Sequence, residues 1–156
     1  MNEPAQKASP NAMRNSARLM AVQAVYQMAV NHKEAPFVVA EYMSIRAGIP
    51  LDGDELVAPD ESLFKSVVLG VADRLSDLKG IVNANRPQKE GQARPDEPLL
   101  EAVLLCGAFE LLVHQDIDFP VIISSYVDVA KAFFSGSEPG LINGVLDSIR
   151  KVTRVE

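Results

Sequence analysis

Chemically reactive side chains are few in this chain and lie far apart in the sequence. The single cysteine, Cys106, lies in the apolar run LLCGAF, where no neighbouring charge would lower the pKa of its thiol. The two histidines, His32 and His114, fall at the ends of expected helices, where they favour the helix dipole more readily than they serve as bases. Glycine-rich phosphate loops, metal-ligand spacings and nucleophile-elbow motifs do not occur. We therefore expect no enzyme activity, no cofactor and no metal.

Two acidic features could also carry chemistry, and both have simpler interpretations. Asp52, Asp54 and Glu55 form a small cluster, but its spacing fits no calcium-binding loop and favours a solvated loop. Glu110 lies within the apolar run GAFELL, where a carboxylate usually needs a partner. Either it occupies the one wet edge of its helix, or it caps the N-terminus of a neighbouring helix.

The composition favours one soluble cytoplasmic domain. The 156 residues are 47% hydrophobic, enough for a sizeable core, and no apolar run is long enough to span a bilayer. The net charge of −6 argues against nucleic-acid binding over the whole surface. The charge is uneven, because residues 35–130 hold 7 basic and 16 acidic residues, whereas residues 1–34 and 131–156 are slightly basic. A local basic face near the two ends is one interpretation, and ordinary solvated charge is the other.

The first helix is predicted to begin at Ser9-Pro10, since Ser suits an N-cap and Pro the first helical position. Apolar residues follow at helical spacing and form one face: Met13, Ala17, Met20, Ala21, Ala24, Val25 and Met28. Arg14 and Arg18 are four residues apart, so they share a neighbouring face. Residues 1–8 are polar and are expected to form a disordered tail.

Further helices are predicted, with their caps, over residues 36–45, 60–81, 96–114, 120–134 and 141–152. Asp60 and Asp96 are the expected N-caps of the two longest. The run LLEAVLLCGAFELLVH is apolar on nearly all sides, so it is expected to be the buried central helix. The turn-rich stretch 135–140 separates the last two helices.

These patterns predict an all-α fold. No segment shows the strict alternation of a half-buried strand, and no internal repeats occur. We expect a compact bundle of about seven helices in one domain, residues 9–156. A proline-containing linker, 86–95, is expected to divide it into two helical subdomains, 9–85 and 96–156.

Three blocks of sequence are informative when taken together. The first is SARLMAVQAVYQM, the second LLEAVLLCGAFELL with the acidic loop HQDIDFP, and the third VIISSYVDVAKAFF followed by GLINGVLD. Their types, order and spacing resemble the NusB family of bacterial transcription antitermination factors. The resemblance covers most of the chain and is faint only between about residues 34 and 60.

The resemblance implies an all-helical RNA-binding protein without catalysis. Members of the family pair with the small ribosomal protein that doubles as elongation factor NusE, and the heterodimer binds the boxA element of nascent RNA, notably ribosomal RNA leaders. The expected partners are therefore boxA-type single-stranded RNA, NusE and the RNA polymerase antitermination complex, with no membrane. Some members associate with themselves, so a homodimer is an alternative.

The resemblance places RNA contacts on the first helix and around the hinge before the last one: Arg14, Arg18, Gln23, Tyr26, Lys131, Phe134, Ser137 and Asn143. Single-stranded RNA needs cations for its phosphates and planar or amide side chains for its exposed bases. For Tyr26 and Phe134 the alternative is core packing. For Asn143-Gly144 we favour a structural role, in which Gly144 lets helices approach closely.

The chain departs from the family pattern in three places. Its first helix has fewer arginines than usual, which predicts fewer phosphate contacts. Ser124-Ser125 stands where the family commonly has Asn-Glu, and Leu105 stands where an Arg is common. Our hypothesis is that a buried Arg–Glu pair has been lost on both sides, at Leu105 and Ser125. The departures leave two other functions open, a diverged protein-interaction module or an accessory of ribosomal RNA processing.

Overall fold

The computed structural model describes residues 9–48, 57–87 and 97–154, and these residues fold into seven helices without a strand. The helices are α1 (Pro10–Asn31), α2 (Ala35–Gly48), α3 (Glu61–Asp73), α4 (Leu75–Asn85), α5 (Pro98–Val113), α6 (Phe119–Phe133) and α7 (Glu138–Thr153). The all-α prediction and the expected number of helices are confirmed for this part of the chain. No helix in the described ranges is long and apolar enough to cross a bilayer.

Some predictions fall on segments outside the described residues. These are the tail at residues 1–8, the acidic cluster at 52–55, the Asp96 cap and most of the linker 86–95. The division into two subdomains therefore stays a prediction.

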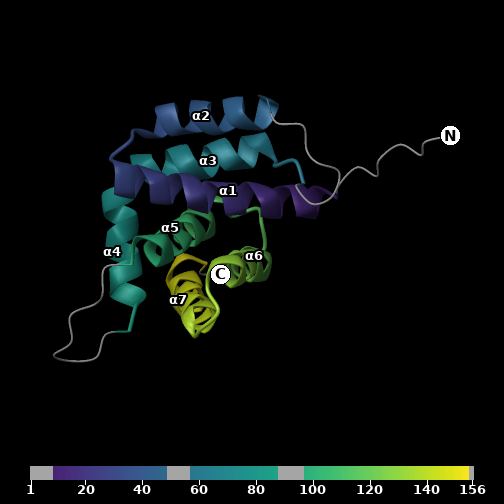
Figure 1. Ribbon diagram of the computed structural model, residues 1–156. Coiled ribbons are helices and arrows are strands. Elements are labelled where there is room, and N and C mark those ends of the chain that lie inside the picture. Colours follow the sequence, from purple (N-terminus) through teal and green to yellow (C-terminus); the bar gives the residue numbers. More distant parts are fainter. Residues whose placement is uncertain (1–8, 49–56, 88–96, 155–156) are drawn as a thin grey trace.

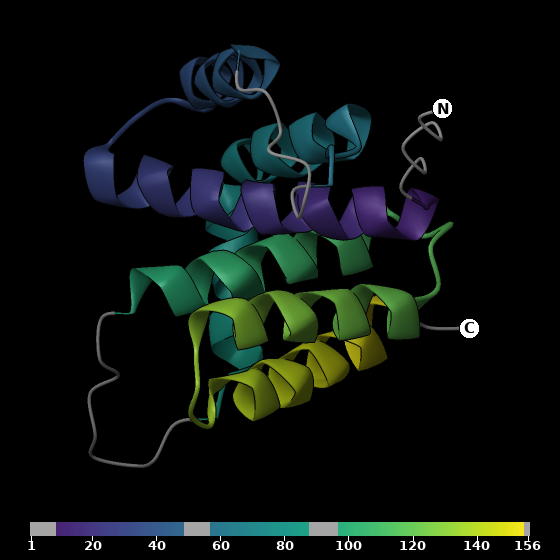
Figure 2. The same cartoon turned by 45° about the vertical axis from the view of Figure 1, so that its right-hand side comes forward.

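Helix α5 lies at the centre of the fold and packs against every other described helix except α2. Helices α1, α2 and α3 contact one another on one side of α5, whereas α6 and α7 lie together on the other side (Figures 1 and 2). Every residue from Ala102 to Leu111 is buried, which confirms the prediction of a buried central helix. A helix this apolar is stable only when neighbours cover all its sides.

Capping residues set the starts of several helices. The Ser9 hydroxyl accepts a hydrogen bond from the Ala12 backbone N–H at 3.1 Å, and Pro10 opens α1, as predicted. The Asp60 carboxylate accepts from the Leu63 N–H at 3.0 Å and caps α3, which confirms the second expected cap. Glu97 is the N-cap residue of α5, although its side chain makes no capping hydrogen bond.

The long helix predicted over 60–81 is wrong in one respect, because the structure divides it at Arg74. Arg74 has φ −112° and ψ 22°, outside the helical region, yet its N–H donates to Gly70 and its carbonyl accepts from Leu78. The bend turns α4 so that it contacts both α5 and α7. Packing against the central helix therefore divides the single helix that the continuous apolar stripe predicted.

The last helix begins at Glu138, earlier than the predicted Leu141. Pro139 lies in its first turn, where the missing proline N–H leaves no hydrogen bond unmade. The turn-rich stretch predicted as a break is thus shorter than expected, because its last residues already belong to α7.

Close helix contacts occur at two glycines other than the one predicted. A Cβ atom at Gly107 would lie 2.8 Å from Leu146 Cδ1, and one at Gly70 would collide with the Phe109 ring. A Cβ atom at either position would require the neighbouring side chain to move. At Gly144 a Cβ atom would meet no atom within 4 Å, so the prediction of a close approach there is wrong.

Arg154, just after α7, holds the C-terminal end of α5. Its Nε donates to the Leu111 carbonyl at 2.7 Å, and its Nη1 donates to the Ile117 carbonyl at 2.8 Å. Its Nη2 donates to the carbonyls of His114 at 2.8 Å and Glu110 at 3.4 Å. The last carbonyls of a helix lack hydrogen-bond donors within the helix, and here one guanidinium supplies such donors.

Candidate nucleic-acid interface

Arg18 is one of the two arginines expected to meet RNA phosphates, but its side chain is only 1% exposed. Its Nε donates to Glu110 Oε2 at 2.7 Å and its Nη2 donates to Glu110 Oε1 at 3.0 Å. This bidentate pair joins α1 to the central helix α5. We therefore correct the expectation for Arg18: its guanidinium is committed to the interior.

Glu110 is completely buried and accepts hydrogen bonds from three residues. Besides Arg18, the Tyr126 hydroxyl donates to it at 2.5 Å and His114 Nδ1 donates at 3.1 Å. Burial by itself would raise the pKa of Glu110, but the hydrogen bonds from His114 and Arg18, with the Arg18 charge, lower it to about 2. Both expected roles, a wet helix edge and a cap of a neighbouring helix, are therefore wrong.

The buried network continues from Glu110 to the molecular surface. His114 Nε2 lies 3.0 Å from Ser66 Oγ on α3, so the imidazole bridges the Glu110 carboxylate and the Ser66 hydroxyl. Burial and the Glu110 charge raise the pKa of Tyr126, which keeps its hydroxyl a donor. The network thus joins residues of α1, α3 and α6 to the central helix.

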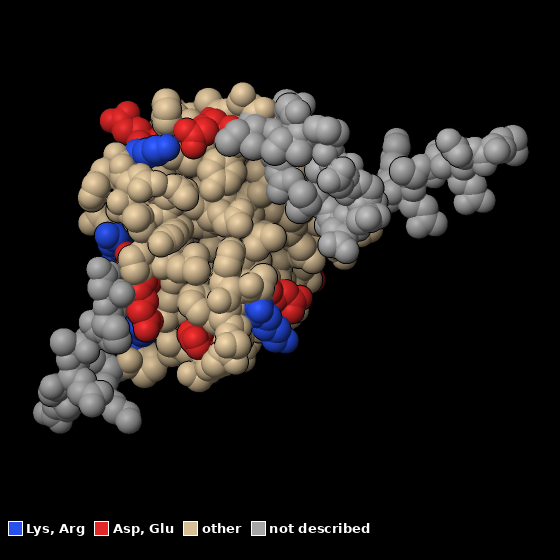
Figure 3. All heavy atoms as spheres, in the orientation of Figure 1, with Lys and Arg blue, Asp and Glu red and all other residues tan. Residues whose placement is uncertain are grey.

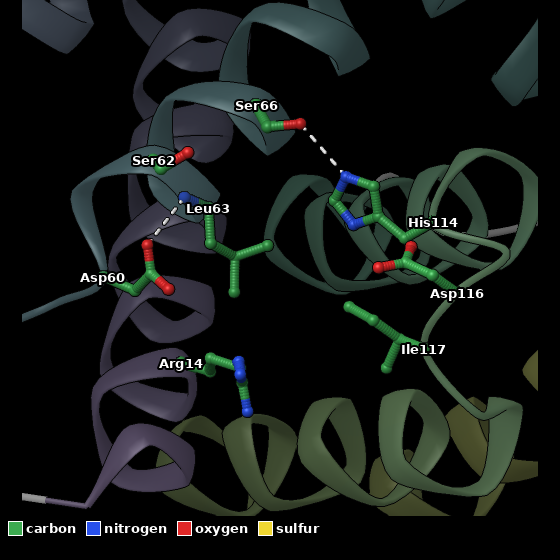
Figure 4. Close-up of a pocket in the computed structure, with 8 residues that line it drawn as sticks. All are labelled: Arg14, Asp60, Ser62, Leu63, Ser66, His114, Asp116 and Ile117. Atoms are coloured by element: carbon green, nitrogen blue, oxygen red, sulfur yellow. Dashed lines mark hydrogen bonds between the residues drawn. The ribbon is translucent and has the colours of Figure 1, made fainter.

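Arg14, one turn before Arg18, has a different environment. It is half-buried and lines a hollow of about 240 Å³ with seven other residues: Asp60, Ser62, Leu63, Ser66, His114, Asp116 and Ile117. Its Nη1 donates to Asn11 Oδ1 at 3.2 Å, and no carboxylate of the described residues lies within ion-pair distance. Figure 4 shows its side chain extending into the hollow from α1, opposite Asp116 and Ile117. The Arg14 guanidinium remains available to a ligand.

The other predicted RNA contacts lie in two separate places. Gln23 is exposed and Tyr26 is partly buried against the core, both in the second half of α1. Lys131, Phe134 and Ser137 lie together where α6 ends and α7 begins. Figure 2 shows this connection at the end of α6 away from the α5–α6 turn that borders the Arg14 hollow.

The hinge residues differ in exposure. Lys131 and Ser137 are exposed, Asn143 lies exposed on α7, and Phe134 is partly buried against the core. The Lys131 ammonium lies 4.0 Å from Asp128, a weak surface pair that leaves it accessible. The core-packing alternative raised for Tyr26 and Phe134 agrees with their partial burial, but both keep some exposed surface.

A second hollow, which was not predicted from the sequence, lies between α1 and α6. About 370 Å³ in volume, it is lined by four amide and hydroxyl side chains and by four other residues: Asn11, Asn15, Ser124 and Ser125, with Arg18, Pro120, Val121 and Asp128. Ser125 Oγ donates to Asn15 Oδ1 at 2.6 Å. Ser125 therefore has its own polar partner on α1. The only signal for this contact was the departure from the family's Asn-Glu.

The hypothesis that an Arg–Glu pair has been lost at Leu105 and Ser125 stays a hypothesis. This chain retains a buried Arg–Glu pair, formed by Arg18 and Glu110. Leu105, at the position where the family commonly has Arg, is buried in the apolar core, and Ser125 pairs with Asn15. Whatever pair those two positions form in relatives, the interior of this protein does not depend on it.

The charged surface is mixed on the face that Figure 3 shows. The described Lys and Arg side chains there are few, lie apart and have Asp or Glu beside several of them. Within the described ranges, no three His, Cys, Asp or Glu side chains cluster as metal ligands would. The chemistry available is hydrogen bonding, ion pairing and stacking at the hollows and the α6–α7 hinge.

The fold and these polar hollows define an all-helical protein suited to binding. A model of the NusB family matches residues 15–151, and the chain belongs to that family. It is 42% identical over 143 residues to the transcription antitermination protein NusB of Sinorhizobium medicae (strain WSM419), covering 92% of this chain and 89% of the relative. The NusB protein of Agrobacterium fabrum (strain C58 / ATCC 33970) is 40% identical over 155 residues, 99% of this chain and 93% of the relative.

A solved structure supports the fold independently. The structure titled "T. maritima NusB, P3121, Form 2" aligns with a TM-score of 0.68, covering 92% of each chain at 19% sequence identity. At that identity the likeness concerns the fold alone. The family suggested by the three sequence blocks is thus confirmed.

Proposed function

We propose that this protein is an RNA-binding transcription antitermination factor that pairs with NusE and binds boxA RNA of nascent ribosomal transcripts. The observation that carries the proposal is the family match over residues 15–151, with relatives named transcription antitermination proteins. The proposal gives the protein no catalytic step. Its task is to hold single-stranded RNA and a protein partner at once, within the RNA polymerase antitermination complex.

The proposed RNA contacts are the surface members of the predicted set. Arg14 supplies a guanidinium without an ion-pair partner among the described residues, and Lys131 supplies an exposed ammonium at the α6–α7 hinge. Amide, hydroxyl and aromatic groups for bases come from the remaining members: Gln23, Tyr26, Phe134, Ser137 and Asn143. Arg18 is left out because its guanidinium is buried.

The test is a titration of fluorescent boxA RNA with this protein, alone and with its cognate NusE, at two salt concentrations. The proposal expects tighter binding when NusE is present, weaker binding at high salt, and loss of binding when the RNA sequence is scrambled. Sedimentation of the free protein in the same buffer reports whether NusE replaces a homodimer.

The same titration distinguishes the alternative functions. A folded protein that binds NusE but no RNA would be a protein-interaction module, which the sparse cations in Figure 3 would favour. RNA binding that ignores both NusE and sequence would instead suit an accessory of ribosomal RNA processing. Either result would overturn the proposed antitermination role.

A further inference from the structure

The hollow beside Arg14 is built from three parts of the fold. Arg14 comes from α1, Ser62 and Leu63 come from the first turn of α3, and Asp116 and Ile117 come from the α5–α6 turn. Figure 4 shows the Arg14 guanidinium on one side, the Asp116 carboxylate on another and the apolar side chains of Leu63 and Ile117 between them. The site therefore offers a cation, an anion and an apolar wall to one ligand.

Several polar groups of this hollow have no partner within the described protein. No hydrogen bond or ion pair to another described residue is found for the Asp116 carboxylate or the Ser62 hydroxyl, and Arg14 contacts only Asn11. In contrast, Ser66 and His114 satisfy each other, and Asp60 caps α3. The free donors and acceptors thus lie on opposite sides of the space.

The size of the hollow limits its occupant. Its volume of about 240 Å³ lies just below the roughly 300–1,000 Å³ typical of pockets for whole small molecules. One planar ring system fits, whereas a complete nucleotide cofactor does not. An isolated phosphate is disfavoured because two carboxylates, Asp60 and Asp116, line the same space.

We infer that this hollow receives one unstacked guanine base of single-stranded RNA, an assignment that rests on the proposed RNA-binding function. Guanine has two adjacent donors, N1–H and the N2 amine, which suit the Asp116 carboxylate. Its O6 and N7 atoms are acceptors that an arginine binds in bidentate fashion, the role assigned to Arg14. Leu63 and Ile117 contact the faces of the ring.

Other bases fit this arrangement less well. Adenine has an acceptor at N1 where the Asp116 carboxylate needs a donor, so two electron-rich groups would face each other. The pyrimidines are smaller and lack the N7 acceptor for Arg14. Selectivity for guanine therefore follows from placing a carboxylate and a guanidinium on different sides of one hollow.

The experiment compares two fluorescent oligouridines, one with a central guanosine and one with a central inosine, which lacks only the N2 amine. The natural protein, with NusE present, is expected to bind the guanosine RNA about tenfold more tightly. Asp116→Asn is expected to reduce this ratio to near one. Asp118→Asn is the matched control, because Asp118 is exposed in the same turn, does not line the hollow and changes the charge equally.

A second variant tests the contacts to O6 and N7 separately from the contact to the N2 amine. Arg14→Gln is expected to weaken binding of both RNAs about equally, because inosine keeps the O6 and N7 acceptors, whereas Arg74→Gln, which removes an exposed charge elsewhere, is expected to leave both affinities intact. Circular dichroism confirms that each variant is folded. A natural protein with equal affinity for both RNAs, or an unchanged ratio in Asp116→Asn, would overturn the guanine assignment while leaving RNA binding in place.

If the proposed RNA-binding function is wrong, the titrations give a different result. In that case neither RNA binds at any salt concentration. If Asp116→Asn then weakens NusE binding while Asp118→Asn does not, the hollow receives a basic side chain of the protein partner, and the guanine assignment falls.

Discussion

Arg14 and Arg18 lie one helical turn apart on α1, yet their side chains lie in opposite environments. Arg18 passes into the interior and forms a bidentate pair with Glu110, whereas Arg14 borders an open hollow and contacts only Asn11. Their environments differ because α5 places a buried carboxylate, that of Glu110, beside Arg18. Burial of a guanidinium is tolerable only where its charge and its donors are matched, and α5 provides that match at one position alone.

The two arginines thus have separate roles, one in structure and one in binding, although they share one face of α1. Arg18 is expected to determine stability and Arg14 to determine RNA affinity. Substitutions of these arginines and of their buried partners test the two roles.

The largest effect is expected from Glu110→Ala, which leaves Arg18 buried without a counter-charge. The free energy of unfolding should fall by about 3–5 kcal/mol. Urea unfolding followed by circular dichroism measures it. Glu101→Ala on the same helix is the control, because its pair with Lys79 is exposed and is worth about 0–1 kcal/mol. A loss for Glu110→Ala as small as that of the control would mean that the buried pair is unimportant.

A smaller loss is expected from Tyr126→Phe, which removes one hydrogen bond to the Glu110 carboxylate and keeps the ring. A hydrogen bond to a charged group contributes about 1.5–3 kcal/mol, so the free energy of unfolding should decrease by that amount. Tyr42→Phe is the matched control, because no hydrogen bond of the Tyr42 hydroxyl is found among the described residues. Equal losses in the two variants would remove Tyr126 from the network.

Stability should also depend on pH through Glu110. Its pKa is lowered from an ordinary value of 4.5 to about 2, so the carboxylate stabilises the folded state fully above pH 4.5. That stabilisation is lost as the pH falls from 4.5 towards 2. Urea midpoints measured across this range should fall less steeply for Glu110→Gln than for the natural protein. Parallel curves would contradict the assigned pKa.

The smallest effect separates the two arginines directly. Arg14→Gln should weaken binding of guanosine-containing RNA about tenfold with little change in stability, because it removes the proposed bidentate contact to O6 and N7. Arg18→Gln should leave the RNA affinity of the folded protein unchanged and lower the free energy of unfolding. If both variants weaken RNA binding equally, the Arg18 guanidinium reaches RNA and the two roles are not separate.

The pattern of apolar residues and caps was enough to predict the helices but not the environment of each polar side chain. Ser9 and Asp60 were identifiable because a cap and its helix are local in sequence. The bend at Arg74 could not be predicted, since it depends on where α5 and α7 lie. Helical spacing gives the face on which Arg18 lies, but not which residue of α5 lies beneath it.

The candidate site shows the same limit. Arg14 was selected from the first helix, but Ser62 and Asp116, which share its hollow, come from distant segments without a common motif. Glu110 did carry a signal, because a carboxylate in an apolar helix calls for a partner. That partner, Arg18, was also selected from the sequence, but as an RNA contact.

The clamp made by Arg154 has a consequence for the order in which this protein can mature on the ribosome. The turn that carries Asp116 and Ile117 obtains its hydrogen bonds from a residue that follows the last helix. Until α7 has been synthesised and has packed against α5, the end of the central helix lacks those partners. In an emerging chain, the proposed base-binding hollow is thus completed only after α7 has been synthesised.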